Sequence, residues 1–384
     1  MDRRDFVKTA GLTALTAGAV LYAAGCERKQ EACSDETAKP LETAAPAVVT
    51  RKTYEWKMVT TWPKNFPGLG TGANQLAQNI EAMSDGRIKI KVYGAGELVP
   101  PFESFEAVSN GTAQMGHAAS YYWKGKSEAA QFFCTVPFGL NAQEMAAWLR
   151  YGGGQELWDQ IYADFNLKPF PCGNTGVQMG GWFNKEINSL SDYEGLKMRM
   201  PGLGGEVIQR AGANAINLPG GEIFQAMQSG TIDATEWVGP YNDLAFGLHK
   251  VAKYYYWPGW HEPGSVMECF INKKEYEALP ADLQAILQIA MQGAYHDMLA
   301  EFTARNNTSL VELVETYHVT LKRFSDEILK KMGELSKDVL AEVAAKDSAS
   351  AKVAASFDKF RKQCGQWNHI GEEGYSLARA LTFG

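Results

Sequence analysis

Four polar side chains between residues 174 and 263 have the types and surroundings expected of a binding site. They are Gln178 in VQMGGW, Arg199 in KMRMPG, Glu236 in DATEWVGP and Glu262 in PGWHEPG. A guanidinium at a strand end is a bidentate partner for a small carboxylate. Two carboxylates and an amide oxygen provide the ligands that a hard cation prefers. The segment therefore predicts a site for a small anion and a metal ion.

The same residues also fit structural roles. Arg199 could form a surface or interdomain salt bridge, and Glu236 and Glu262 could cap helices or form turns. Carboxylates buried in aromatic surroundings, however, need a cation or a proton. The residue types alone leave both interpretations open.

Other chemical motifs in the chain are weak. Residues 68–73 (GLGTGA) meet a loose dinucleotide pattern, but Pro63 and Pro67 lengthen the loop beyond the tight turn that a pyrophosphate needs. We therefore expect a glycine-rich binding loop there. No GxSxG motif is present, and the cysteines after residue 130 lack the spacing of a zinc site.

The elements that must position these residues alternate between strands and helices. Period-two patterns predict strands, and apolar residues three or four positions apart predict helices. We expect strands over 54–61, 88–93, 114–119, 170–183, 196–200 and 232–238. We expect helices over 74–84, 102–110, 141–165, 204–211, 222–228, 282–317, 326–345 and 349–364. This order favours an α/β fold with a helix-covered parallel sheet and an α-helical C-terminal region.

The first 26 residues have the pattern of an export signal. Arg3 and Arg4 followed by DFVK match a twin-arginine signal, and the apolar stretch 9–25 is too short for a comfortable membrane span. The sequence AAGC resembles a lipoprotein cleavage box, so Cys26 could carry a lipid; ordinary cleavage nearby is the alternative. Residues 27–52 are polar and aperiodic and predict a flexible linker. We therefore expect a periplasmic protein.

Charge and length narrow the class further. The net charge of −7 argues against binding to nucleic acid or to a membrane through a basic patch. After the signal and the linker, about 330 residues remain, enough for two domains. Export also excludes most enzymes that depend on ATP, NAD or coenzyme A.

Residues 180–263 closely resemble the solute-binding proteins of tripartite ATP-independent periplasmic (TRAP) transporters. The subgroup they resemble captures 2-oxo and 2-hydroxy monocarboxylates such as pyruvate or lactate. The motifs MRMPG, GTIDATEW and PGWHEPG carry the resemblance, which extends from Tyr54 to the C-terminus. It implies a two-lobed periplasmic binding protein fold whose hinge-crossing strands let the lobes close on a ligand. Lobe I would comprise 53–175 plus about 258–300, and lobe II 176–257 plus about 301–384 with the C-terminal helices.

The resemblance also implies a role for each candidate residue. Arg199 would bind the ligand carboxylate. A bridging Na⁺ or Ca²⁺ ion would be held by the side chains of Gln178, Glu236 and Glu262 and by the backbone carbonyl of Trp237. The aromatic walls would come from Trp237 and from Tyr121 or Tyr122. Membrane permease subunits are the implied partners, and a second copy would pair through the C-terminal helices.

Physical reasoning supports this set of roles. A 2-oxoacid presents two adjacent oxygens that can chelate one cation, and two carboxylates without a cation would repel an anion. The metal is therefore expected to be part of the site.

The export signal departs from the ordinary secretory signal of many relatives.

Two other functions remain as alternatives. A periplasmic metal-dependent enzyme could use Glu236 or Glu262 as a base on a small organic acid. We expect no third acidic or histidine ligand for a catalytic transition metal, which favours binding without catalysis. A sensor that presents its closed state to a signalling receptor is the other alternative.

Overall fold

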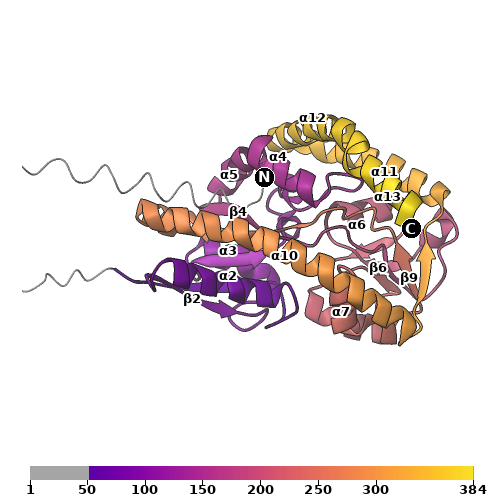
Figure 1. Cartoon of the computed structure of the whole chain (residues 1–384), viewed down its shortest axis with the longest axis horizontal. Helices are drawn as coiled ribbons and strands as arrows, with labels where there is room; N and C mark the ends of the chain where they lie inside the picture. Colours follow the sequence, from indigo (N-terminus) through magenta and orange to yellow (C-terminus); the bar gives the residue numbers. More distant parts are fainter. Residues whose placement is uncertain (1–51, 384) are drawn as a thin grey trace, which may run out of the picture. The chain divides into compact units, whose positions relative to one another are not determined.

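The computed structural model describes residues 52–383, which form two β-sheets with helices packed around them (Figure 1). The predicted signal over 1–26, Cys26 and nearly all of the predicted linker lie outside the described residues. The predicted α/β fold with a helical C-terminal region is confirmed. Among the helices of the described part, none is both long and apolar enough to cross a membrane.

The first sheet has the strand order β2-β1-β3-β10-β4. Its members are β1 (Tyr54–Thr60), β2 (Ile88–Tyr93), β3 (Met115–Ala118), β4 (Leu167–Asn174) and β10 (Val266–Asn272). β1 is parallel to β2 and β3, whereas β10 is antiparallel to β3 and β4. Every residue of β10 is buried, as expected for a strand with two neighbours and both faces covered.

The second sheet has the strand order β11-β9-β5-β8-β6-β7. Its members are β5 (Gly181–Phe183), β6 (Lys197–Arg199), β7 (Asn214–Ile216), β8 (Ala234–Thr235), β9 (Tyr254–Trp257) and β11 (Thr320–Arg323). β6 is parallel to both β7 and β8, and β9 is parallel to β11. β5 is antiparallel to β8 and β9. The parallel group β7-β6-β8 brings several strand ends to one edge.

Helices cover both sheets. They are α2 (Gly70–Met83), α3 (Ser104–Ser109), α4 (Ala142–Tyr151), α5 (Gly154–Ala163), α6 (Gly202–Arg210), α7 (Gly220–Gln228), α8 (Pro240–Phe246), α9 (Lys273–Glu277), α10 (Ala281–Glu315), α11 (Asp326–Lys346), α12 (Ser348–Ile370) and α13 (Glu372–Phe383). The long helix α10 contacts α2 and β4 beside the first sheet and α8 beside the second (Figure 1). It therefore links the helical layers of the two sheets.

The strands of the two sheets come from interleaved parts of the chain. Those of the first sheet fall within 54–174 and 266–272, and those of the second within 181–257 and 320–323. Among the C-terminal helices, α11 contacts α6, and α12 contacts α4 and α5. The limits of the two lobes stay a prediction.

The expected glycine-rich loop at 68–73 is wrong, because α2 begins at Gly70 and includes most of this stretch. A Cβ atom at Gly70 would lie 2.7 Å from the carbonyl oxygen of Pro63. The glycine therefore lets the first turn of the helix approach the preceding backbone. The expected helix over 141–165 is two helices, α4 and α5, separated at Gly153, whose φ is +84°.

The expected strand over 232–238 is shorter than its alternating pattern predicts. Only Ala234 and Thr235 pair in the sheet. The chain then leaves the sheet edge, and the amide N–H of Val238 donates to the carboxylate of Asp243 instead of to a strand. A side-chain carboxylate thus takes the place of the backbone acceptor that a neighbouring strand would provide. The alternation of apolar and polar residues cannot reveal such a substitution.

The core beside the first sheet contains a buried carboxyl, that of Glu268 in β10. It accepts hydrogen bonds from the indole of Trp123 and from the hydroxyl of Tyr162, the latter at 2.7 Å. Burial raises the pKa of Glu268 to about 8, although both hydrogen bonds act to lower it.

We expect Glu268 to make the stability of the protein depend on pH. The unfolded carboxyl ionises near its ordinary pKa of 4.5 and the folded one only near 8, so the folded state binds more protons between these values. The free energy of unfolding is then expected to fall as pH rises through this window, by at most about 1.4 kcal/mol per pH unit. Glu268→Gln is expected to reduce that slope in urea unfolding between pH 6 and pH 9. Equal slopes in the two proteins would contradict this assignment.

Candidate functional site

The structure brings Arg199 and Glu236 together at one edge of the second sheet. Arg199 ends β6 and pairs in register with Thr235 of β8, and Glu236 follows Thr235. Because β6 and β8 are parallel, their carboxyl ends meet at the same edge. The amide N–H of Glu236 donates to the carbonyl of Arg199 at 3.1 Å, which fixes this pairing.

Gln178 and Glu262 come from two connections between the sheets. Gln178 lies between β4 and β5, and Glu262 lies between β9 and β10. The amide N–H of Gln178 donates to the carbonyl of Glu262 at 3.1 Å, and that of Gly259 donates to the carbonyl of Gln178 at 3.0 Å. Backbone hydrogen bonds therefore hold the two connections side by side.

The guanidinium of Arg199 is fully buried. Its Nη1 donates to the carboxylate and, at 3.3 Å, to the backbone carbonyl of Glu236, and its Nε donates to the carbonyl of Leu218 at 3.2 Å. Its Nη2 lies 3.4 Å from the hydroxyl of Tyr122. Burial is the largest single influence and lowers the pKa of Arg199, but the charge of Glu236 and smaller effects from Tyr122, Tyr121 and Glu262 together raise the pKa above its ordinary value. Arg199 therefore keeps its positive charge.

Glu262 adds a second carboxylate to this cluster. It is buried, it accepts a hydrogen bond from the hydroxyl of Ser265, and it has no salt-bridge partner among residues 52–383. Burial, followed by the charge of Glu236, raises the pKa of Glu262 well above its ordinary value. Two buried carboxylates thus lie near one guanidinium that pairs with only Glu236, and the local charge favours a further cation.

Two buried acceptor atoms fit such a cation. The side-chain oxygen Oε1 of Gln178 and Oε2 of Glu236 have no hydrogen-bond partner within the described part of the chain. A buried acceptor that lacks a donor costs about 1–3 kcal/mol. An ion that prefers oxygen ligands would satisfy both atoms at once.

His261 is a residue that the sequence analysis missed. It is buried, and its Nε2 lies 3.6 Å from Oε2 of Glu236. Glu236, His261 and Glu262 each offer one ligand atom within 4.8 Å of the others. The expectation that no histidine would join the two glutamates was therefore wrong. Alternation would place neighbours on opposite sides, but the chain turns here, with the amide N–H of Glu262 bonded to the carbonyl of Gly259.

Aromatic side chains enclose the charged cluster. The ring centre of Trp237 lies 5.1 Å from the guanidinium carbon of Arg199, and the rings of Tyr121 and Tyr122 meet edge to face at 4.8 Å. Trp62, which the sequence analysis did not select, contacts both Tyr122 and Trp237. Trp62 follows β1 and the two tyrosines follow β3, so the first sheet supplies one side of the site.

Asp243 holds the segment that carries Glu236 and Trp237. Its buried carboxylate accepts hydrogen bonds from Val238 N–H at 3.2 Å, the indole of Trp182 at 2.9 Å and the hydroxyl of Tyr255 at 2.7 Å. No local motif marks Asp243, because its three donors lie on different elements. Through these hydrogen bonds, Asp243 holds the turn after β8 against β5 and β9.

Residues 58–347 match the family model of DctP, the bacterial extracellular solute-binding protein family 7. The chain belongs to this family. The resemblance seen in the sequence is thus confirmed. Because the family is extracellular, its membership places the mature protein outside the cytoplasm.

Relatives of this solute-binding protein have been characterised. It is 42% identical over 375 residues to a monocarboxylate 2-oxoacid-binding periplasmic protein from Nostoc sp., with 98% of each chain covered. Two crystal structures of TRAP periplasmic solute-binding proteins are each 42% identical to it, with a TM-score of 0.83. That from Pseudoalteromonas atlantica, with bound sodium and pyruvate, covers 87% of this chain and 100% of its own. That from Colwellia psychrerythraea, with bound calcium and pyruvate, covers 85% and 100%.

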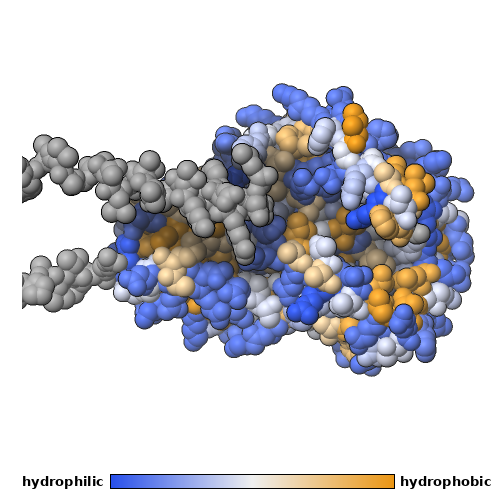
Figure 2. All heavy atoms as spheres, viewed as in Figure 1, coloured by the Kyte–Doolittle hydropathy of each residue, from blue (hydrophilic) through white to orange (hydrophobic). Residues whose placement is uncertain are grey.

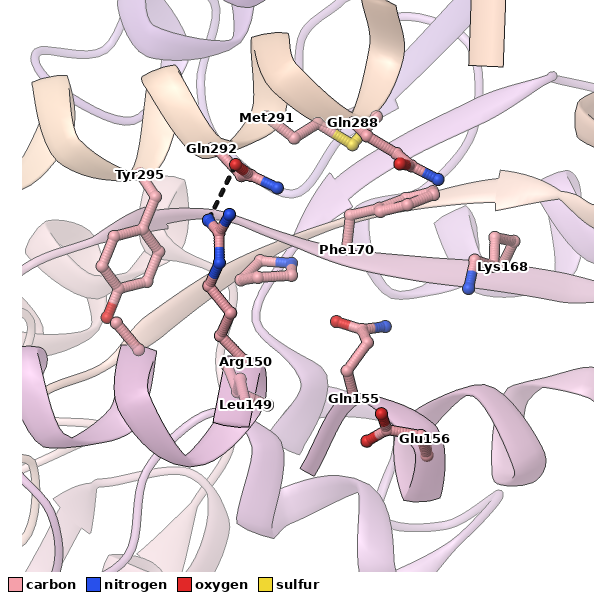
Figure 3. A pocket seen from close by; sticks show the side chains of 12 residues that line it. Leu149, Arg150, Gln155, Glu156, Lys168, Phe170, Gln288, Met291, Gln292 and Tyr295 are labelled. Atoms are coloured by element: carbon pink, nitrogen blue, oxygen red, sulfur yellow. Dashed lines mark hydrogen bonds between the residues drawn. The ribbon is translucent and has the colours of Figure 1, made fainter. Parts of the chain in front are cut away.

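A separate pocket of about 340 Å³ lies between α4, α5, β4 and α10 (Figure 3). Arg150 and Gln292 meet across it through a hydrogen bond of 2.8 Å, and Lys168 and Glu156 lie on its other side. None of its lining residues belongs to the cluster around Arg199. This surface hollow of the solute-binding protein is therefore distinct from the candidate site.

We expect Asp243→Ala to destabilise the protein by about 3 kcal/mol or more, because three buried donors lose their acceptor. Asp243→Asn keeps one acceptor oxygen and is expected to lose less. Urea unfolding at pH 8 measures both, and Asp338→Ala on the exposed side of α11 is the matched control. A free energy of unfolding for Asp243→Ala equal to that of the control would exclude this anchoring role.

Proposed function

We propose that the chain captures a small 2-oxo or 2-hydroxy monocarboxylate, of the pyruvate or lactate type, together with a Na⁺ or Ca²⁺ ion. It would deliver the acid to the membrane permease of a TRAP transporter. The observation that carries this proposal is the buried grouping of one guanidinium with two carboxylates at the junction of the two sheets. The pyruvate, sodium and calcium bound by the two related structures support it.

The chain offers four oxygen donors for the ion. They are the side-chain oxygens of Gln178, Glu236 and Glu262 and the backbone carbonyl of Trp237. When bound, the ion supplies the positive charge that the two carboxylates lack and a coordination point for the oxygens of the acid. The unpartnered oxygens of Gln178 and Glu236 support this assignment.

Arg199 would hold the carboxylate of the acid through its Nη2 edge. Its Nε and Nη1 donors are taken by Leu218 and Glu236, whereas Nη2 has only the long contact with the Tyr122 hydroxyl among the described residues. Tyr122 can turn its hydroxyl toward the same carboxylate. The rings of Tyr121 and Trp237 would exclude water and so strengthen these polar contacts.

Membership of a solute-binding family points to a receptor that releases its ligand unchanged rather than to the metal-dependent enzyme. The site draws on both sheets and on the two connections between them, so a bound ligand would favour the arrangement in which these parts are close. Release would require the connections to move apart, as in hinge closure and opening.

Export by the twin-arginine route is part of the proposal, because Arg3 and Arg4 precede a short apolar stretch. Lipid attachment at Cys26 is the second part, and it rests on the AAGC sequence. A lipid there would hold the receptor close to the membrane through the linker that follows.

The C-terminal helices support a homodimer. None of the residues of α13 is buried, and Leu381 and Phe383 are 88% and 89% exposed. Figure 2 shows hydrophobic side chains on the face where Figure 1 draws α13. A helix of this length is marginal in water unless its apolar side chains are covered. A groove of about 1020 Å³ along α11 and α12, lined by Phe138, Leu329, Leu340, Ala344 and Ala354, provides an apolar surface that α13 of a second copy would cover.

Thermal melting of the metal-stripped protein tests the binding site. We expect pyruvate with Ca²⁺ to raise the melting temperature more than the sum of the two separate additions, because each ligand compensates the charge of the other. Pyruvate without a cation is expected to produce little shift. A full shift with pyruvate alone would contradict the proposed role of the ion.

The matched variant is Arg199→Lys, which keeps the charge but loses the planar fork. We expect this variant to fold and to lose most of the pyruvate-dependent shift while keeping a shift with Ca²⁺. Arg210→Lys, on an exposed stretch of α6, is the control. An unchanged pyruvate response in Arg199→Lys would remove Arg199 from the anion site.

Light scattering during gel filtration tests the dimer. We expect the wild-type protein to have twice the mass of one chain, and Leu377→Arg combined with Leu381→Arg to have the mass of one. Gln366→Arg, an added charge at an exposed position of α12, controls for charge alone. A monomeric wild-type protein, or a dimeric double variant, would contradict the proposed interface.

A further inference from the structure

The imidazole of His261 is buried, and neither of its ring nitrogens has a hydrogen-bond partner within residues 52–383. A buried polar group without a partner is costly and calls for a ligand or an ion. The nearest charged group is the carboxylate of Glu236, whose Oε2 is also unpartnered, at 3.6 Å from Nε2 of His261. The two groups face each other without forming a hydrogen bond.

This separation suits two ligands of a single ion. It is too long for a hydrogen bond, whereas metal bonds of about 2.0–2.2 Å place neighbouring donors about 2.9–3.6 Å apart. One donor atom from each of Glu236, His261 and Glu262 lies within 4.8 Å of the others, so the three could hold one ion after small shifts that bring the more distant donors together. The turn at Gly259–Glu262 makes this possible by directing adjacent side chains to the same side.

We propose that His261 is a third side-chain ligand at the end of the ion site formed by Glu236 and Glu262. Its nitrogen would let that site take a first-row divalent transition ion such as Zn²⁺ in addition to Na⁺ or Ca²⁺. Imidazole nitrogen is a preferred ligand of zinc and its neighbours, whereas sodium and calcium take oxygen. The inference rests on the proposed ion site and extends the range of cations that it accepts.

His261 is assigned to the metal ion rather than to the bound acid because its imidazole faces Oε2 of Glu236. Arg199 is engaged by the opposite carboxylate oxygen of Glu236, so Oε2 and the imidazole share the side of Glu236 away from the guanidinium. An ion between these two groups satisfies both.

Calorimetric titration of the metal-stripped full chain with Zn²⁺ and, separately, Ca²⁺ tests the inference. We expect His261→Gln to weaken Zn²⁺ binding by at least about 10-fold, since loss of an outer-shell partner alone costs that much, and to change Ca²⁺ binding by less than about threefold. His296→Gln, an exposed histidine of α10, is the control for adventitious binding. Equal Zn²⁺ affinity in the wild type and His261→Gln would overturn the inference.

A spectroscopic measurement gives an independent answer. With one equivalent of Cu²⁺, pulsed electron paramagnetic resonance of the wild type and of His296→Gln is expected to show coupling to an imidazole nitrogen, and His261→Gln is expected to lose it. Absence of the coupling in the wild type would overturn the inference without any variant. If His261→Gln does not fold, His261→Ala serves in its place.

The outcomes also separate this inference from the proposed function. A pyruvate shift that needs Ca²⁺ and persists in His261→Gln, together with unchanged Zn²⁺ affinity, would overturn the transition-metal role alone. Loss of the pyruvate shift in His261→Gln with unchanged Zn²⁺ affinity would assign His261 to the acid and likewise overturn it. Failure of the wild type to respond to pyruvate and Ca²⁺ would instead count against the proposed function.

Discussion

The burial of one guanidinium beside two carboxylates, only one of which it pairs with, is the constraint on which this structure depends. All three side chains are buried: Arg199, Glu236 and Glu262. Desolvating each of them costs several kcal/mol, and only fixed neighbours of opposite charge recover that loss. The surrounding backbone must therefore hold the three side chains in place. The parallel ends of β6 and β8 do so for Arg199 and Glu236, and the connection after β9 does so for Glu262.

The position of the cluster links binding to the relative arrangement of the two sheets. Gln178 and Glu262 lie on connections that run from one sheet to the other. Trp62 and Tyr122 follow strands of the first sheet, and Trp62 contacts Trp237, which follows β8 of the second sheet. Any ligand that contacts all of these groups requires the two sheets to be close. Binding energy gained at the site therefore also favours the conformation in which the two sheets are close. A receptor that signals its ligand-bound state needs this coupling.

Residues marked by local sequence features were predictable, and those placed by distant contacts were not. Gln178, Arg199, Glu236 and Glu262 stand in turns or at strand ends, and together with the family resemblance this let their gathering be expected from the sequence. Asp243 has no such mark, because its role comes from three donors on separate elements. The role of His261 could not be predicted, because it depends on the turn at Gly259–Glu262, and the alternation of apolar and polar residues does not reveal that turn. The strand pattern over 232–238 failed for a related reason, since a side-chain acceptor takes the place of a neighbouring strand.

Charge balance explains why a metal ion and an organic acid would be bound together. When both carboxylates are ionised, as ion binding requires, they and Arg199 leave one net negative charge, which disfavours a buried anion. A monovalent ion and a monocarboxylate together leave that charge unchanged, and a divalent ion with the same acid removes it. The burial cost of the acid is therefore met only when the ion is present. The same balance works against catalysis by Glu236 or Glu262, since a carboxylate committed to an ion is a weak base toward the ligand beside it.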